Sequence, residues 1–167
     1  MRRIAAAALP LALAGCGWIG GDLSTADLCR SAPDTDVRAT LGVPETGALA
    51  ENVENGVCVW SATGDDGMPR RLTVAVHREA ALAGATPPQT GVAFFEDELR
   101  LLEEEHPRTR VLGGLGDAAV IGFGALGEGP FAGGLVARKD SDVLVMRVEG
   151  EDPAAFEAVA RAVADAM

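Results

Sequence analysis

The stretch VCVWSATGDDGMPRRLTVAVHR, residues 57–78, contains two segments with the two-residue alternation of β-strands. In residues 57–62 the side chains of Cys58 and Trp60 face the same way, so the indole can pack near the cysteine. Residues 71–78 alternate again, and a turn rich in Gly and Asp joins the two segments. This pattern predicts an antiparallel β-hairpin.

Strand-like segments recur in the second half of the chain. Residues 109–112 and 120–124 are strand candidates, and residues 131–138 and 143–148 form a second predicted hairpin. Because most of these connections are of the hairpin type, we expect an antiparallel sheet.

Four segments carry helix signals. A capping-box pattern at residues 24–27 and a start signal at residues 33–36 predict two short helices, the second of which ends at Gly42. The clearest helix is expected from residue 91 to residue 106, and a final helix begins at residues 152–153. The apolar stripes of the two longer helices are Val92, Phe95, Leu99 and Leu102 in one, and Phe156, Val159 and Val163 in the other.

The order of these elements indicates the fold class. Residues 45–56 and 79–90 are expected to be turn and loop segments between the predicted elements. The pattern predicts an α+β fold, with an antiparallel sheet covered by helices in a two- or three-layer sandwich. The alternative is an immunoglobulin-like β-sandwich, in which a Trp also packs near a disulfide, but three clear helices count against it.

The first residues have the layout of an export signal. Two arginines, Arg2 and Arg3, precede an apolar run that is much shorter than the about 20 residues of a transmembrane helix. The run ends in Leu-Ala-Gly-Cys, which resembles the lipobox of bacterial lipoproteins. The resemblance implies a signal peptide at 1–15, lipid on Cys16, a tether at 16–22 and a single extracytoplasmic domain at 23–167. The alternative is an ordinary secretory signal.

Charge and cysteine content limit the partners. A net charge of −11 gives no footprint for nucleic acid, which is bound through many Lys and Arg contacts to phosphate. With Cys16 assigned to the lipid, Cys29 and Cys58 form an even pair that is expected to be a disulfide in an oxidising compartment. The alternative, a metal site with His77 and His106, has unsuitable ligand spacing.

No catalytic or cofactor motif stands out. Gly114, Gly116 and Ala119 match a G-x-G-x-x-A spacing, but a β-type run follows where a nucleotide site needs a helix, so we expect a turn or bulge. His106 lies at a helix end, where the dipole favours the cation, and His77 is expected to be solvated or hydrogen-bonded. The acidic residues of the long helix are expected to form a solvated face rather than a calcium site.

Several short motifs occur in an order that resembles small actinobacterial lipoproteins classed as a domain of unknown function. The motifs are the lipobox ending at Cys16, Asp27-Leu28-Cys29, Cys58-Val59-Trp60, Leu115-Gly116-Asp117-Ala118-Ala119 and the terminal helix. The resemblance implies a Cys29–Cys58 disulfide and a PsbP-like α/β/α sandwich. It transfers no activity.

Three functions follow as hypotheses. The leading one is a membrane-anchored, non-catalytic binding or interaction module of the cell envelope, without cofactor or metal, whose partner is an envelope protein or an amphiphilic ligand. The second is a carrier of a lipid or other amphiphile, with a pocket lined by Phe94, Phe95, Phe123 and Phe131, although these rings can equally fill the core. The third is an envelope hydrolase, against which the absence of a G-x-S-x-G motif counts.

Overall fold

The computed structural model describes residues 25–54, 56–64, 66–124 and 130–167. The predicted signal peptide (1–15), the lipidation site Cys16, the tether (16–22) and the capping residue Ser24 lie outside the described residues. In the described part of the chain, no helix is long and apolar enough to cross a membrane.

The centre of the fold is an open sheet of seven strands, in which every pair of neighbours is antiparallel. The order across the sheet is β1-β2-β3-β7-β6-β5-β4, so the last strand of the chain lies between β3 and β6. The strands are β1 (Ala50–Glu54), β2 (Val57–Thr63), β3 (Pro69–His77), β4 (Arg108–Val111), β5 (Ala118–Phe123), β6 (Phe131–Lys139) and β7 (Asp142–Gly150).

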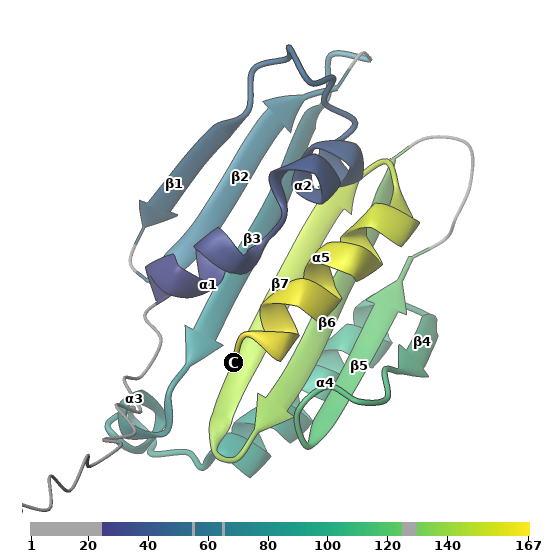
Figure 1. Cartoon of the computed structure of the whole chain (residues 1–167). Coiled ribbons are helices and arrows are strands. Elements are labelled where there is room, and N and C mark those ends of the chain that lie inside the picture. The colour runs from purple at the N-terminus through teal and green to yellow at the C-terminus, as the bar shows by residue number, and fades with distance from the viewer. Residues whose placement is uncertain (1–24, 55, 65, 125–129) are drawn as a thin grey trace, which may run out of the picture.

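Helices lie on both sides of this sheet (Figure 1). We call the side covered by α1, α2 and α5 the α5 face, and the side on which α4 packs against β4 to β7 the α4 face. The helices are α1 (Thr25–Ser31), α2 (Asp34–Leu41), α3 (Glu79–Ala83), α4 (Gly91–Glu105) and α5 (Pro153–Asp165). The predicted mixture of helices with an antiparallel sheet is confirmed. The described strands form one sheet, whereas an immunoglobulin-like fold needs two.

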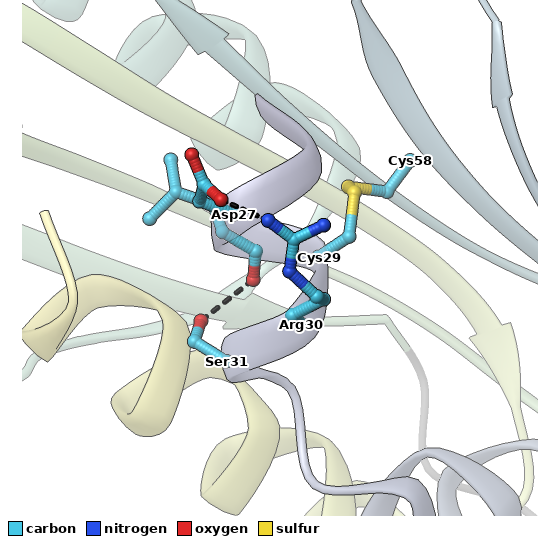
Figure 2. Close-up of a disulfide and its surroundings, with 6 residues drawn as sticks. Asp27, Cys29, Arg30, Ser31 and Cys58 are labelled. Carbon is cyan, nitrogen blue, oxygen red and sulfur yellow. Dashed lines mark hydrogen bonds and ion pairs between the residues drawn. A yellow bond between two sulfur atoms is a disulfide. The ribbon is translucent and has the colours of Figure 1, made fainter. Parts of the chain in front are cut away.

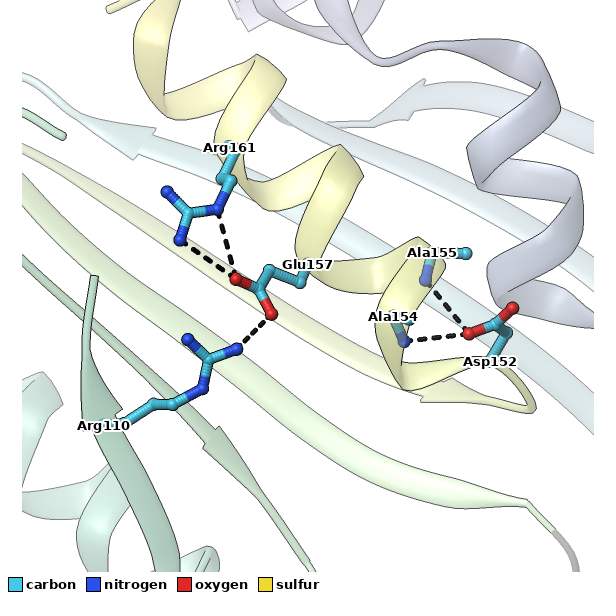
Figure 3. A network of polar contacts seen from close by, with 6 residues as sticks. All are labelled: Arg110, Asp152, Ala154, Ala155, Glu157 and Arg161. Carbon is cyan, nitrogen blue, oxygen red and sulfur yellow. Dashed lines mark hydrogen bonds and ion pairs between the residues drawn. The ribbon is translucent and has the colours of Figure 1, made fainter. Parts of the chain in front are cut away.

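The larger core lies on the α5 face. The predicted stripe of α5 is fully buried there, together with Leu28 of α1, Leu41 of α2 and Trp60 of β2. The helix begins as predicted, because the Asp152 carboxylate accepts hydrogen bonds from the N–H groups of Ala154 and Ala155 at 2.8 and 3.0 Å (Figure 3). Such a cap stabilises a helix by about 1 kcal/mol.

An ion-pair network joins α5 to the edge strand β4 (Figure 3). Glu157 accepts hydrogen bonds from Nε and Nη2 of Arg161 at 3.1 and 3.0 Å, and it also pairs with Arg110 of β4. Partial burial opposes ionisation of the carboxyl group, but the two guanidinium groups outweigh it and hold the pKa of Glu157 below its ordinary value.

The predicted disulfide between Cys29 and Cys58 is present (Figure 2). It joins α1 to β2 with a Cα–Cα distance of 5.8 Å, which lies in the ordinary range. An isolated helix of seven residues is not stable in water, so the covalent link and the burial of Leu28 hold α1 on the sheet.

Two elements lie where turn and loop segments were expected. Strand β1 pairs along its whole length with β2, from Ala50 opposite Ser61 to Glu54 opposite Val57. Sequence patterning missed it because its described side chains are exposed, so it has no apolar face that alternates. The short helix α3 was missed because Leu82 is its only buried residue.

A smaller core lies on the α4 face. Its buried members are Phe95 and Leu102 of α4 and Val136 and Val143 of the sheet, and Leu99 packs at its edge. Val92, the fourth residue of the predicted stripe, is 50% exposed. The stripe by which α4 is attached is therefore narrower than the sequence pattern indicates.

Candidate functional site

Two hollows meet at the end of the sheet where β3 and β6 begin and β7 ends. The first, of about 390 Å³, lies beside the last turn of α4, and its lining residues are Arg71, Thr73, Glu105, Ala132, Gly133, Arg147, Val148 and Glu149. The second, of about 300 Å³, is lined by Met68, Pro69, Arg70, Pro130, Phe131, Ala132 and Glu149. Because they share Ala132 and Glu149, we treat them together as the sheet-end groove.

The register between β3 and β7 places the polar side chains of this groove. Arg71 lies opposite Glu149, and Thr73 lies opposite Arg147. Strand alternation directs these side chains to the α4 face, away from the larger core. Gly134 of β6 lets α4 approach the sheet closely beside the groove, because a Cβ atom there would lie 2.7 Å from a methyl group of Leu102 and 3.3 Å from Nη1 of Arg147.

The two arginines of the α4 face have different surroundings. Nη2 of Arg147 donates to Glu98 at 3.0 Å, and its Nε lies 3.7 Å from a carboxylate oxygen of Glu105, so this arginine ties β7 to α4. Arg71 is exposed and forms no ion pair within the described residues. A ligand in the groove would therefore meet one guanidinium group that is not engaged in an ion pair, with Glu149 opposite it on β7.

The neighbouring Arg70 is part of the scaffold. Its side chain is 2% exposed, and Nη2 donates to Asp66 at 2.8 Å and to Glu151 at 3.1 Å. The hydrogen bond from Arg70 lowers the pKa of Asp66, and the same contact, followed by that to Glu151, raises the pKa of Arg70. Its Nε atom is buried and has no partner among the described residues.

The second hollow supplies an apolar wall. Met68, which is 57% exposed, and Pro69 lie on one side, and Pro130 and Phe131 lie on the other. The sheet-end groove thus combines an unpaired cation and a hydroxyl group with an apolar surface. This arrangement can hold an extended peptide segment or an amphiphile, because each needs apolar contact beside a few oriented polar groups.

The four phenylalanines predicted to line a pocket do not lie together. Phe94 and Phe95 belong to α4, whereas the rings of Phe123 and Phe131 contact Phe156 of α5 at centroid distances of 6.2 Å each. The sheet separates the two pairs. Phe131 lines a hollow, and the other three pack in or beside the two cores.

The two histidines lie at opposite ends of α4. His77 is half-buried and packs on the Phe94 ring, whereas a solvated or hydrogen-bonded side chain was expected, and burial lowers its pKa against the opposing charge of Glu98. His106 follows the last residue of α4 and is 5% exposed. Burial lowers the pKa of His106 against the opposing charge of Glu105, and the nearby Arg147 lowers it further.

The glycine motif between β4 and β5 forms a turn. Gly114 and Gly116 have φ angles of 80° and 53°, and β5 begins at Ala118. A turn between strands was the expected interpretation, and it is confirmed. Within the described ranges, no group of three or more His, Cys, Asp or Glu residues is arranged to hold a metal ion.

No family model, curated protein or solved structure matches the chain. The groove was not found by sequence reasoning, because its residues come from β3, β6, β7 and α4 and share no local motif. The one local signal is the pair Arg70-Arg71 at the start of a predicted strand, where alternation sends the two side chains to opposite faces.

Proposed function

We propose that this protein is a lipid-anchored, extracytoplasmic binding module of the cell envelope, related to the small actinobacterial lipoproteins, and that its role is recognition rather than catalysis. The lipobox-like sequence ending at Cys16 supports the anchor, and the Cys29–Cys58 disulfide is typical of an oxidising compartment. Helices on both faces of the sheet support a three-layer α/β/α sandwich of the PsbP-like kind as part of this proposal.

The observation that carries the binding role is the position of Arg71. Its exposed guanidinium group lies in the sheet-end groove without an ion-pair partner in the described part of the chain, beside the Thr73 hydroxyl group. The leading partner is a segment of an envelope protein. The apolar wall formed by Met68 and Phe131 favours an amphiphile as the second candidate. A histidine-based hydrolase has less support, because His77 and His106 lie at opposite ends of α4.

The anchor is tested with Cys16→Ser in native cells fed an alkyne-labelled fatty acid. The wild-type protein should carry the label and sediment with membranes, and the variant should lose both properties. The variant Cys29→Ser is a control, since it removes a different cysteine and leaves the lipobox-like sequence intact. A labelled Cys16→Ser variant would contradict the proposed anchor.

The binding site is tested with a photo-crosslinking amino acid placed at Met68 in the groove or, as a control, at Arg30 on α1. We expect a crosslinked species from position 68 only, and a lower yield when Arg71→Ala is added. Mass spectrometry of that species distinguishes a protein from a small amphiphile. Equal yields from positions 68 and 30, or no effect of Arg71→Ala, would rule out the groove as the site.

A further inference from the structure

The only two histidines of the chain both lie against α4, one at each end. At the first turn, the His77 ring of β3 lies 4.4 Å from the Phe94 ring, measured between centroids. At the other end, the N–H group of His106 donates to the Leu102 carbonyl at 2.9 Å, and its side chain is almost fully buried. A histidine, whose side chain titrates near neutral pH, therefore lies against each end of α4.

The side chain of His106 packs closely against β5. A Cβ atom at Gly122 would lie 3.0 Å from Cβ of His106, and one at Gly124 would lie 3.8 Å from its Nδ1. Nδ1 is buried and has no partner among the described residues. Protonation makes both ring nitrogens donors, so the cation would place a charged and unpaired N–H group against β5.

Charged groups around the two rings give the cations little compensation. For His106, the closest carboxylate oxygen is that of Glu105 at 4.0 Å from Nε2, and Arg147 of β7 opposes the cation. For His77, Glu98 of α4 favours the cation, but Glu98 is already bound to Arg147. Asp142, beside the β7 residue that pairs with His77, is bound to Arg78.

We propose that α4 is a proton-sensitive wall of the sheet-end groove, released from the sheet when His77 and His106 become charged. The release would separate Glu105 from Arg147, two residues that line the groove, and would change the shape and charge of the binding surface. The claim that this release regulates binding rests on the proposed function of the groove. The claim that α4 moves does not depend on that function.

The attachment of α4 is weak enough for this role. Its core has four buried members, whereas α5 alone buries six residues on the opposite face. Three consecutive glutamates, Glu103, Glu104 and Glu105, stand in the last turn of α4, where the helix dipole disfavours negative charge. Burial lowers the pKa of both histidines, so the neutral forms that fit the packed helix are the ones present at neutral pH.

The test is amide hydrogen exchange of the full-length protein, with rates corrected for the intrinsic effect of pH. Between about pH 7.5 and about pH 5.5, exchange of residues 99–105 in α4 should accelerate several-fold, because the two histidines, whose pKa values burial lowers in the packed protein, take up protons more readily when α4 is released. Exchange in α5 should stay slower than exchange in α4 at the lower pH, because α5 exposes its amides only when the whole domain unfolds. Equal protection of α4 and α5 at the lower pH, or no acceleration of α4, would overturn the proposal.

The double variant His77→Gln, His106→Gln keeps neutral polar side chains at both positions and should show no acceleration in α4 at the lower pH. If that variant does not fold, NMR titration of the two imidazole rings in the wild-type protein gives the answer. Midpoints below 6.5 for both rings support the proposal, and a midpoint at or above 6.5 for either ring overturns it. Neither measurement uses a ligand, so a failure here is distinct from a failure of crosslinking at Met68.

Discussion

Arg70 and Glu151 are 81 residues apart in the sequence, and Nη2 of the first donates a hydrogen bond of 3.1 Å to the carboxylate of the second. The N–H group of Glu151 donates to the Thr40 carbonyl at 2.7 Å, and its carboxylate lies where a side chain at Gly42 would have to be. The ion pair joins the start of β3 to the junction between β7 and α5, and the backbone hydrogen bond joins that junction to the end of α2.

Replacing Arg70 should destabilise the whole domain. Arg70→Ala removes two charge-assisted hydrogen bonds and leaves Glu151 packed against Gly42, and we expect the free energy of unfolding to fall by about 2 kcal/mol. The adjacent Arg71→Ala is a matched control, because that side chain is exposed, and should change stability by less than about 0.5 kcal/mol. Urea denaturation measures both. Equal effects would mean that the ion pairs of the buried Arg70 side chain do not stabilise the fold.

Loss of the disulfide should be costly. The bond closes a loop with a sequence separation of 29 residues, for which the chain-entropy account gives about 3–4 kcal/mol. We expect the free energy of unfolding of the double variant Cys29→Ser, Cys58→Ser to be lower by that amount. The variant should therefore unfold at a lower urea concentration. A reducing agent should lower the midpoint of the wild-type protein and leave that of the variant unchanged. If reduction leaves the urea midpoint of the wild-type protein unchanged, Cys29 and Cys58 are not joined by a disulfide.

The first residue of α4 tolerates no side chain. A Cβ atom on Gly91 would lie 2.0 Å from the Ser141 carbonyl oxygen in the turn between β6 and β7, so Gly91→Ala should destabilise the protein by about 1–3 kcal/mol. Gly113→Ala offers the comparison, since no atom lies within 4 Å of the new methyl group. If thermal unfolding is the same for both variants, the close approach of α4 to that turn is not present in solution.

Stability should fall on mild acidification. Burial lowers the pKa of His77 and of His106 from 6.5, so below that pH the unfolded chain binds more protons than the folded protein, and the free energy of unfolding decreases. We expect the free energy of unfolding to be lower at about pH 5.5 than at about pH 7.5. Asp66 and Glu157, whose pKa values are lowered from 3.8 and 4.5, lose their contribution only in more acidic solution.

The double variant His77→Gln, His106→Gln is the control for that change, because glutamine does not titrate. Urea midpoints at the two pH values should differ in the wild-type protein and agree in the variant. A wild-type midpoint that rises on acidification would show that the two histidines are stabilised as cations in the folded protein.

Sequence patterning identified the elements that carry an apolar face or a cap. The alternation around Trp60 and the Asp152 cap predicted β2 and α5 because burial and capping leave a periodic trace in the sequence. Strand β1 has no such trace, since it is stabilised by backbone pairing to β2 rather than by burial of its side chains. The disulfide was predictable for a similar reason, because it follows from counting cysteines. The partners of Arg70 were not predictable, because they leave no pattern in the sequence.

The candidate site was beyond sequence reasoning for a related reason. Periodicity indicates that Phe94 and Phe123 are apolar residues of a helix and a strand, but it does not indicate on which side of the sheet each one lies. The order of the strands decides that, and the order depends on the connection from β3 through α3 and α4 to the far edge at β4. Arg71, Glu105 and Arg147 meet only because β7 pairs with β3.

The central position of β7 also governs how the molecule is assembled. Before residues 142–150 are in place, β1 to β3 and β4 to β6 are two partial sheets, each with an unsatisfied edge. The same strand closes both edges, and the pairing of Arg71 with Glu149 requires contact between distant parts of the chain. We therefore expect folding to be slow and cooperative, because the sheet is complete only when β3 and β6 both pair with β7.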